Sequence, residues 1–255
     1  EAIQMGVLDE ADLDRNLLRV LTQRFRLGEM DGASPWDSLP ESIVEGDEHK
    51  ALSLKMARES VVLLQNKGGI LPLKGGEKIA LIGPNADDRE MMWGNYNPVP
   101  KETVTLLDAM KTRVSDLVTF RGCGIIDSKY KPQSNPFFAQ VGQMTDKELA
   151  DLAKQFAIGV NDIRNYARRE QIMSSSFLPE LDVDSVLSQL EGIDIVVFAG
   201  GISPRFEGEE MPVQVPGFSG GDKTDIELPE VQRTLLKALH DAGKKVILVN
   251  FSGSA

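Results

Sequence analysis

The sequence DIVVFA at residues 194–199 decides the fold, because it is a short, β-branched and apolar run that two glycines follow. Three similar runs occur elsewhere in the chain: KIALIGP at 78–84, LVTFR at 117–121 and KVILVNF at 245–251. Each is apolar along nearly its whole length, which is typical of strands covered on both faces. Helical patterns lie between them, at 104–113 and 229–242. The alternation predicts an α/β fold, a three-layer α/β sandwich with a mostly parallel sheet.

The N-terminal part of the chain predicts a separate element. Residues 9–27 have the apolar period of an amphipathic helix, which Gly28 ends. Residues 29–46 contain glycine, proline and scattered acids without a period, which indicates a linker and a domain boundary. A further helix is expected from about Asp47 to Asn66. The predicted parts are a helix at 1–28, a linker at 29–46, and an α/β domain at 47–255 with an insertion at about 127–181.

Composition and charge exclude several classes of function. Apolar residues make up 41% of the chain without an apolar run long enough for a membrane helix, so membrane insertion is not expected. With 28 basic and 39 acidic residues the net charge is −11, which disfavours nucleic-acid binding. Cys123 is the single cysteine, and His49 and His240 lie far apart in the sequence. We therefore expect no metal site.

Ligands of an open parallel sheet bind beyond the carboxyl ends of its strands, so the loops after the apolar runs are candidate sites. The loop after 78–84 contains Asp87 and Asp88, and it lacks the glycines with which a nucleotide-binding loop approaches phosphates. No nucleotide cofactor is expected. Trp93 and Tyr96 follow in the same loop; stacking on a sugar is one interpretation, and packing is the favoured one.

The loop after 194–201 reads ISPRFEGEEM at 202–211 and contains three carboxylates, those of Glu207, Glu209 and Glu210. One interpretation is a solvated acidic loop. The other is that neighbouring negative charges raise the proton affinity of one member, which then serves as a carboxylic acid near neutral pH. Cleavage of a glycosidic bond needs such an acid and a second carboxylate on the other side of the bond.

At this loop the sequence resembles glycoside hydrolase family 3, in its β-xylosidase and β-glucosidase branch. The resemblance rests on GGISPRFEGEEM at 200–211 and GGDKTDIELPEVQRTLL at 220–236, and on three further blocks in compatible order, at 6–31, 51–73 and 78–87. Lys223 stands where the family usually has Arg, and Asp222 with Lys223 is expected to form an ion pair that shapes the loop.

The resemblance implies a retaining β-glycosidase that hydrolyses terminal β-linked sugars of oligosaccharides. It assigns the acid/base role to Glu207, while the choice among Glu207, Glu209 and Glu210 stays open. The expected substrate-binding residues are Arg205, Glu209 and Glu210. An alternative role for Arg205 is to orient the acid. The nucleophile of the family is an Asp in a (β/α)8 barrel. Residues 6–31 resemble the last helix of that barrel and the start of the linker after it.

Three expectations follow for the whole protein. The upstream barrel is an expected partner domain, and the chain is expected to be cut from a longer protein and to be inactive alone. The compartment is expected to be periplasmic or extracellular. The main alternative function is a non-catalytic carbohydrate-binding or docking module on the same scaffold, because a fold does not by itself imply catalysis.

Overall fold

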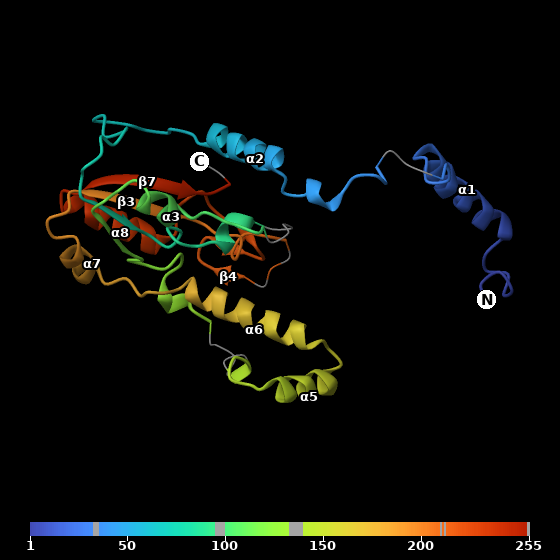
Figure 1. The fold of residues 1–255 in the computed structure, drawn as a ribbon. Helices are drawn as coiled ribbons and strands as arrows, with labels where there is room; N and C mark the ends of the chain where they lie inside the picture. The colour runs from blue at the N-terminus through green and yellow to red at the C-terminus, as the bar shows by residue number, and fades with distance from the viewer. Residues whose placement is uncertain (33–35, 95–99, 133–139, 210, 212, 254–255) are drawn as a thin grey trace. The chain divides into compact units, whose positions relative to one another are not determined.

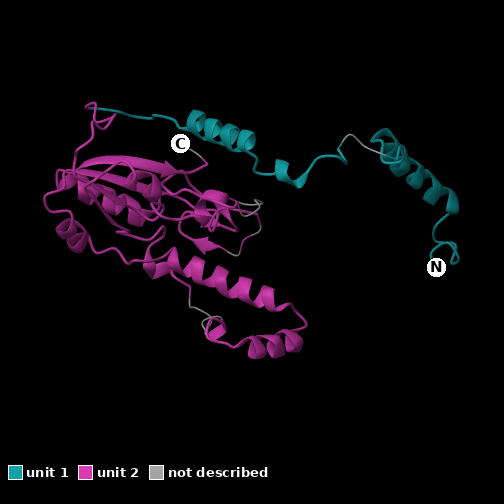
Figure 2. Cartoon of the chain, in the orientation of Figure 1, with its two compact units in different colours: residues 1–67 teal, residues 68–255 magenta. Residues whose placement is uncertain are grey.

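The computed structural model describes residues 1–255 except 33–35, 95–99, 133–139, 210, 212 and 254–255. The chain divides into two compact units, residues 1–67 and residues 68–255 (Figure 2). The predicted boundary within 29–46 stays a prediction. None of the helices in the described ranges is long and apolar enough to cross a membrane.

In its described residues the first unit contains two α-helices and a short 3-10 helix. Helix α1 spans Glu10–Arg26, and the Asp9 side chain caps it by accepting the Ala11 N–H at 3.1 Å. The 3-10 helix η1 spans Glu41–Ile43, and helix α2 spans Asp47–Ser60. Helix α2 is therefore shorter than predicted, because the chain becomes extended at the β-branched Val61.

The second unit contains a parallel sheet of four strands in the order β2-β1-β3-β7. Strands β3 and β7 are neighbours in this sheet and are labelled in Figure 1. Its strands are β1 (Ile79–Ile82), β2 (Leu117–Phe120), β3 (Ile195–Gly201) and β7 (Lys245–Phe251). All three pairings are parallel, which confirms the predicted α/β class. Three two-residue strands form a separate antiparallel sheet after β3: β4 (Gln214–Val215), β5 (Phe218–Ser219) and β6 (Asp222–Lys223).

Helices cover both faces of the parallel sheet. Alternate residues of a strand point to opposite faces, so Ile79 and Leu81 of β1 face one side while Ala80 and Ile82 face the other. The first pair packs in one cluster with residues of α3 (Leu106–Lys111). The second pair packs in another cluster with residues of α7 (Val183–Gln189) and α8 (Glu230–Asp241). The three-layer sandwich is confirmed.

The connection order creates a switch point between β1 and β3. The chain passes from β1 to β2 on one side of β1, and it then returns to place β3 on the other side. The loops that leave β1 and β3 therefore begin at neighbouring strand ends and run in different directions. In α/β sheets a ligand crevice forms at such a point.

The predicted insertion lies between β2 and β3. It contains the 3-10 helix η3 (Ser128–Tyr130) and the helices α5 (Asp146–Phe156) and α6 (Val160–Ser175). The two helices share a small core of their own, formed by Val141, Leu149, Ala153, Ile163 and Ala167. The 3-10 helix η2 (Glu90–Trp93) follows the β1 loop, and the Glu90 carboxylate pairs with Arg168 of α6.

Candidate functional site

The acidic loop after β3 is held by a buried aromatic residue. Phe206 is 1% exposed, and its ring centroid lies 5.6 Å from that of Phe177, edge to face, and 5.6 Å from that of Phe218. The N–H groups of Phe206 and Glu207 donate to the Ser203 carbonyl at 2.9 and 3.2 Å. Glu207 therefore directly follows a buried residue in the turn, and it is itself partly exposed.

The other end of the loop is fixed by a close backbone approach. The Gly208 N–H donates to the Gly221 carbonyl at 2.9 Å. Gly221 has a φ of +94°, and a Cβ atom there would lie 2.0 Å from the Gly208 carbonyl oxygen. Of the remaining acids, Glu209 is exposed and Glu210 lies outside the described residues. The preference for Glu207 as the acid/base stays a prediction.

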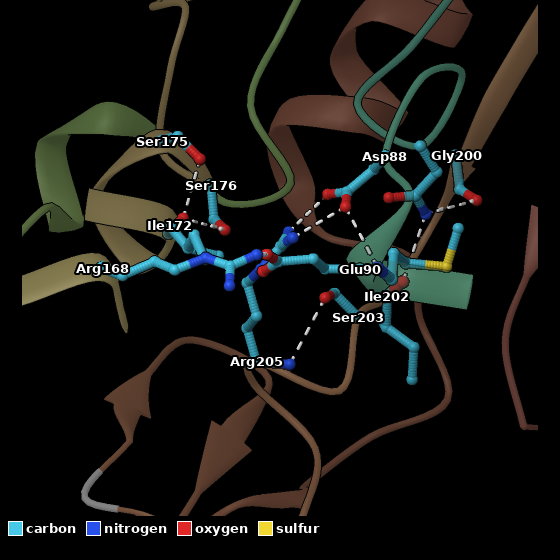
Figure 3. Close-up of polar contacts among 12 residues, drawn as sticks. Asp88, Glu90, Arg168, Ile172, Ser175, Ser176, Gly200, Ile202, Ser203 and Arg205 are labelled. Atoms are coloured by element: carbon cyan, nitrogen blue, oxygen red, sulfur yellow. Dashed lines mark hydrogen bonds and ion pairs between the residues drawn. The ribbon is translucent and has the colours of Figure 1, made fainter. Parts of the chain in front are cut away.

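Arg205 forms a bidentate ion pair with Asp88 across the switch point (Figure 3). Its Nη1 and Nη2 lie 2.5 and 2.7 Å from the two carboxylate oxygens, and each side chain is 14% exposed. Asp88 also accepts the Met91 N–H at 3.0 Å. Burial alone would raise the pKa of Asp88, but the hydrogen bonds and charge of Arg205 outweigh burial and hold that pKa below its ordinary value.

A second arginine lies at the same edge of the sheet. Arg121 follows β2 directly and is partly buried, and its buried Nε has no hydrogen-bond partner among the residues that the structure describes. Burial lowers the pKa of Arg121, against the attraction of the Asp88 charge. Arg121 and the role of Asp88 were not predicted from the sequence. The available signal was that both follow apolar strands, at the edge where parallel-sheet ligands bind.

Two buried amide side chains hold the end of β3. Asn85 donates from Nδ2 to the carbonyls of Gly200 and Ile202 at 3.2 and 3.1 Å. Gln232 of α8 accepts the Gly201 N–H at 2.8 Å and donates to the carbonyls of Gly201 and Ile125 at 2.8 and 3.0 Å. The base of the acidic loop is thereby connected to the β1 loop, to α8 and to the segment after β2.

Two further expectations concern Trp93 and the Asp222–Lys223 pair. The Trp93 Nε1 donates to the Thr103 hydroxyl at 2.8 Å in a partly buried site, which fits the packing interpretation, and Tyr96 lies outside the described residues. The expected ion pair between Asp222 and Lys223 was wrong, because the Lys223 ammonium donates instead to the Glu227 carbonyl at 2.9 Å. Adjacent residues of a strand point to opposite faces, which separates these two charges.

The described ranges contain no group of three His, Cys, Asp or Glu side chains that could hold a metal ion. The described side chains at this edge include the carboxylates of Asp88 and Glu207 and the guanidinium groups of Arg121 and Arg205. A partly exposed carboxylate next to a fixed loop can donate or accept a proton, and the neighbouring Arg205–Asp88 pair can fix its position.

The sequence of this chain matches a known protein family. The glycosyl hydrolase family 3 C-terminal domain matches residues 61–255. The xylan 1,4-beta-xylosidase of Xylanibacter ruminicola is 34% identical over 352 aligned residues, covering 100% of this chain and 41% of that protein. The periplasmic beta-glucosidase of Salmonella typhimurium is 26% identical over 258 residues, covering 98% of this chain and 29% of that protein.

Solved structures have the same fold. A β-glucosidase from Erythrobacter marinus aligns with 99% of this chain and 30% of its own, with a TM-score of 0.64 at 24% identity. The chain thus spans less than half the length of each of these three proteins. Because the family match covers most of the chain, the protein belongs to glycosyl hydrolase family 3, in the group of β-xylosidases and β-glucosidases, and contains the family's C-terminal domain.

Proposed function

We propose that this chain supplies the general acid/base of a retaining β-glycosidase, and that Glu207 is that residue. The observation that carries the proposal is the position of Glu207. It follows the switch-point strand β3, directly after the buried Phe206 and one residue before the Gly208–Gly221 contact. A general acid must be held within hydrogen-bond reach of the leaving oxygen, and a loop fixed on both sides meets that need.

In the proposed reaction, a barrel Asp upstream of this chain attacks the anomeric carbon while Glu207 protonates the departing oxygen. The glycosidic bond breaks as the bond to Asp forms. Glu207, now a carboxylate, then takes a proton from water, and the resulting nucleophile releases the sugar from Asp. The xylan 1,4-beta-xylosidase among the relatives favours a terminal β-xyloside as the substrate. A relative named as a periplasmic enzyme supports a periplasmic or secreted location.

The test is Glu207→Ala in the full-length enzyme that includes the barrel. Loss of a general acid should lower kcat on xylobiose by about 10² to 10⁴-fold. Hydrolysis of an aryl β-xyloside with a good leaving group should fall much less in its first step, because that leaving group needs no proton, and azide should restore turnover by replacing activated water. Glu191, an exposed carboxylate that precedes the amino end of β3, provides the matched control, since Glu191→Ala should affect both substrates only slightly.

Equal loss on both substrates without azide rescue would contradict the assignment and favour Glu209 or Glu210. The 255-residue chain alone should not hydrolyse a nitrophenyl β-xyloside, because the proposed nucleophile lies elsewhere. Robust hydrolysis by the chain alone would contradict that division of roles. A carbohydrate-binding module would instead bind xylo-oligosaccharides in calorimetry without any effect of Glu207→Ala on catalysis.

A further inference from the structure

The Asp88–Arg205 pair differs from the other ion pairs of the described residues. Each of those other pairs has at least one side chain that is more than half exposed, whereas both members of this pair are 14% exposed. Exposed pairs contribute little to structure because water and salt screen them. A bidentate, mostly buried arginine–carboxylate pair fixes the orientation of both groups.

The pair also joins two loops that lie far apart in the sequence. Asp88 belongs to the loop after β1 and Arg205 to the loop after β3, 117 residues later. Asp88 is itself oriented by the Met91 N–H at 3.0 Å, and the Arg205 N–H donates to the Ser203 hydroxyl at 3.3 Å. Figure 3 shows both guanidinium contacts to Asp88 and the Ser203 contact at the base of the same loop.

We infer that Asp88 is a positioning residue for catalysis, which fixes the acid-bearing loop by pairing with Arg205, two residues before Glu207. The inference rests on the proposed function of Glu207. Phe206 holds this loop from the core side, and the Arg205–Asp88 pair holds it from the side of the β1 loop. If the Arg205–Asp88 pair is removed, Glu207 can still donate a proton, but the loop no longer fixes its distance to the leaving oxygen.

The measurement that separates positioning from general stability is the dependence on the leaving group. Asp88→Asn keeps the size of the side chain and an oxygen for the Met91 N–H, but it removes the negative charge that pairs with Arg205. In the full-length enzyme, kcat on xylobiose should fall about 10-fold, since a misplaced catalytic group can cost up to about 100-fold. An aryl β-xyloside with a good leaving group should lose less than about twofold in its first step, and KM should change little on either substrate.

Glu90→Gln is the matched control. It removes an ion pair from the same loop, two residues after Asp88, but that pair is with Arg168 of α6 and not with the acid-bearing loop. We expect the same small effect on both substrates. Arg205→Lys is the second variant: it keeps the positive charge but loses the bidentate geometry, so it should produce the same leaving-group dependence even where Asp88→Asn folds poorly.

The double variant Asp88→Asn/Arg205→Lys should be no slower on xylobiose than the slower single variant, because both changes break one contact. Equal losses on both substrates, or additive losses in the double variant, would overturn the inference. Glu207→Ala is measured in parallel. If it shows leaving-group dependence and the Asp88 and Arg205 variants do not, the positioning role fails alone. If Glu207→Ala shows none, the proposed function of Glu207 fails.

Discussion

Replacing Gln232 by Leu tests whether the end of β3 is held by α8. Gln232 is 0% exposed and makes three hydrogen bonds, one from the Gly201 N–H and one each to the Gly201 and Ile125 carbonyls. Leucine has a similar volume and no polar atoms, so the change removes these bonds without a large cavity. It leaves a buried N–H and two buried carbonyls short of a partner.

The expected cost follows from these three groups. A buried polar group that loses its partner costs about 1–3 kcal/mol. The Gly201 N–H loses the partner that the structure gives it, whereas each carbonyl retains a second lone pair for other contacts. The Leu side chain also avoids the burial of a polar amide, which offsets part of the loss. We therefore expect the free energy of unfolding to fall by about 3 kcal/mol.

Urea unfolding of the 255-residue chain, followed by circular dichroism, measures this change. The control is Gln189→Leu, a change of the same type on the exposed surface of α7, which should stay within about 0.5 kcal/mol of the parent. A loss below about 1 kcal/mol for Gln232→Leu, or one no larger than that of the control, would refute the argument that these hydrogen bonds hold the loop base.

Three further predictions concern the same domain. Gly201→Ala should lower the free energy of unfolding by more than about 2 kcal/mol, because φ is +113° and the new Cβ would lie 2.1 Å from a backbone oxygen. Gly192→Ala is the control and should lower that free energy less, because the space around Gly192 is open. Equal losses in the two variants would contradict the steric argument. The Cys123 thiol, whose pKa burial raises to about 12, should react with a disulfide reagent at pH 8 only after unfolding; rapid reaction of the folded chain would contradict its burial. Because the folded pKa of Asp88 is lowered, its pairing stabilises above the ordinary Asp pKa and is lost as pH falls through the folded value. The stability difference between the parent and Asp88→Asn should therefore shrink as the pH falls below the ordinary Asp pKa, and a constant difference would contradict the lowered pKa.

The strands were predictable because their signal is local. Continuous β-branched runs such as 194–199 can be buried on both faces only in a covered sheet, and the structure has strands at all four predicted positions. The end of α2 was less predictable. The sequence up to Asn66 keeps an apolar period, but the chain leaves the helix at Val61, where β-branched residues favour an extended backbone.

The candidate site also has a part that the sequence predicted and a part that it did not. The acidic loop at 202–211 could be recognised because three carboxylates stand together after a strand. Arg205 was named as a site residue, but its partner was not, since a carboxylate 117 residues away is brought close only by the strand order. The same applies to Arg121, whose charge acts on Asp88 because β2 lies beside β1.

The sequence by itself determined the α/β class, the strand positions and the acidic loop, because each depends on the period or the clustering of residues near one another in the chain. Only the tertiary structure decided which loops meet. The switch point between β1 and β3 brings Asp88 to Arg205, and the packing of α8 brings Gln232 to Gly201. The physical reason is that ion pairs and buried hydrogen bonds depend on distances in space, which the order of strands sets and no local pattern encodes.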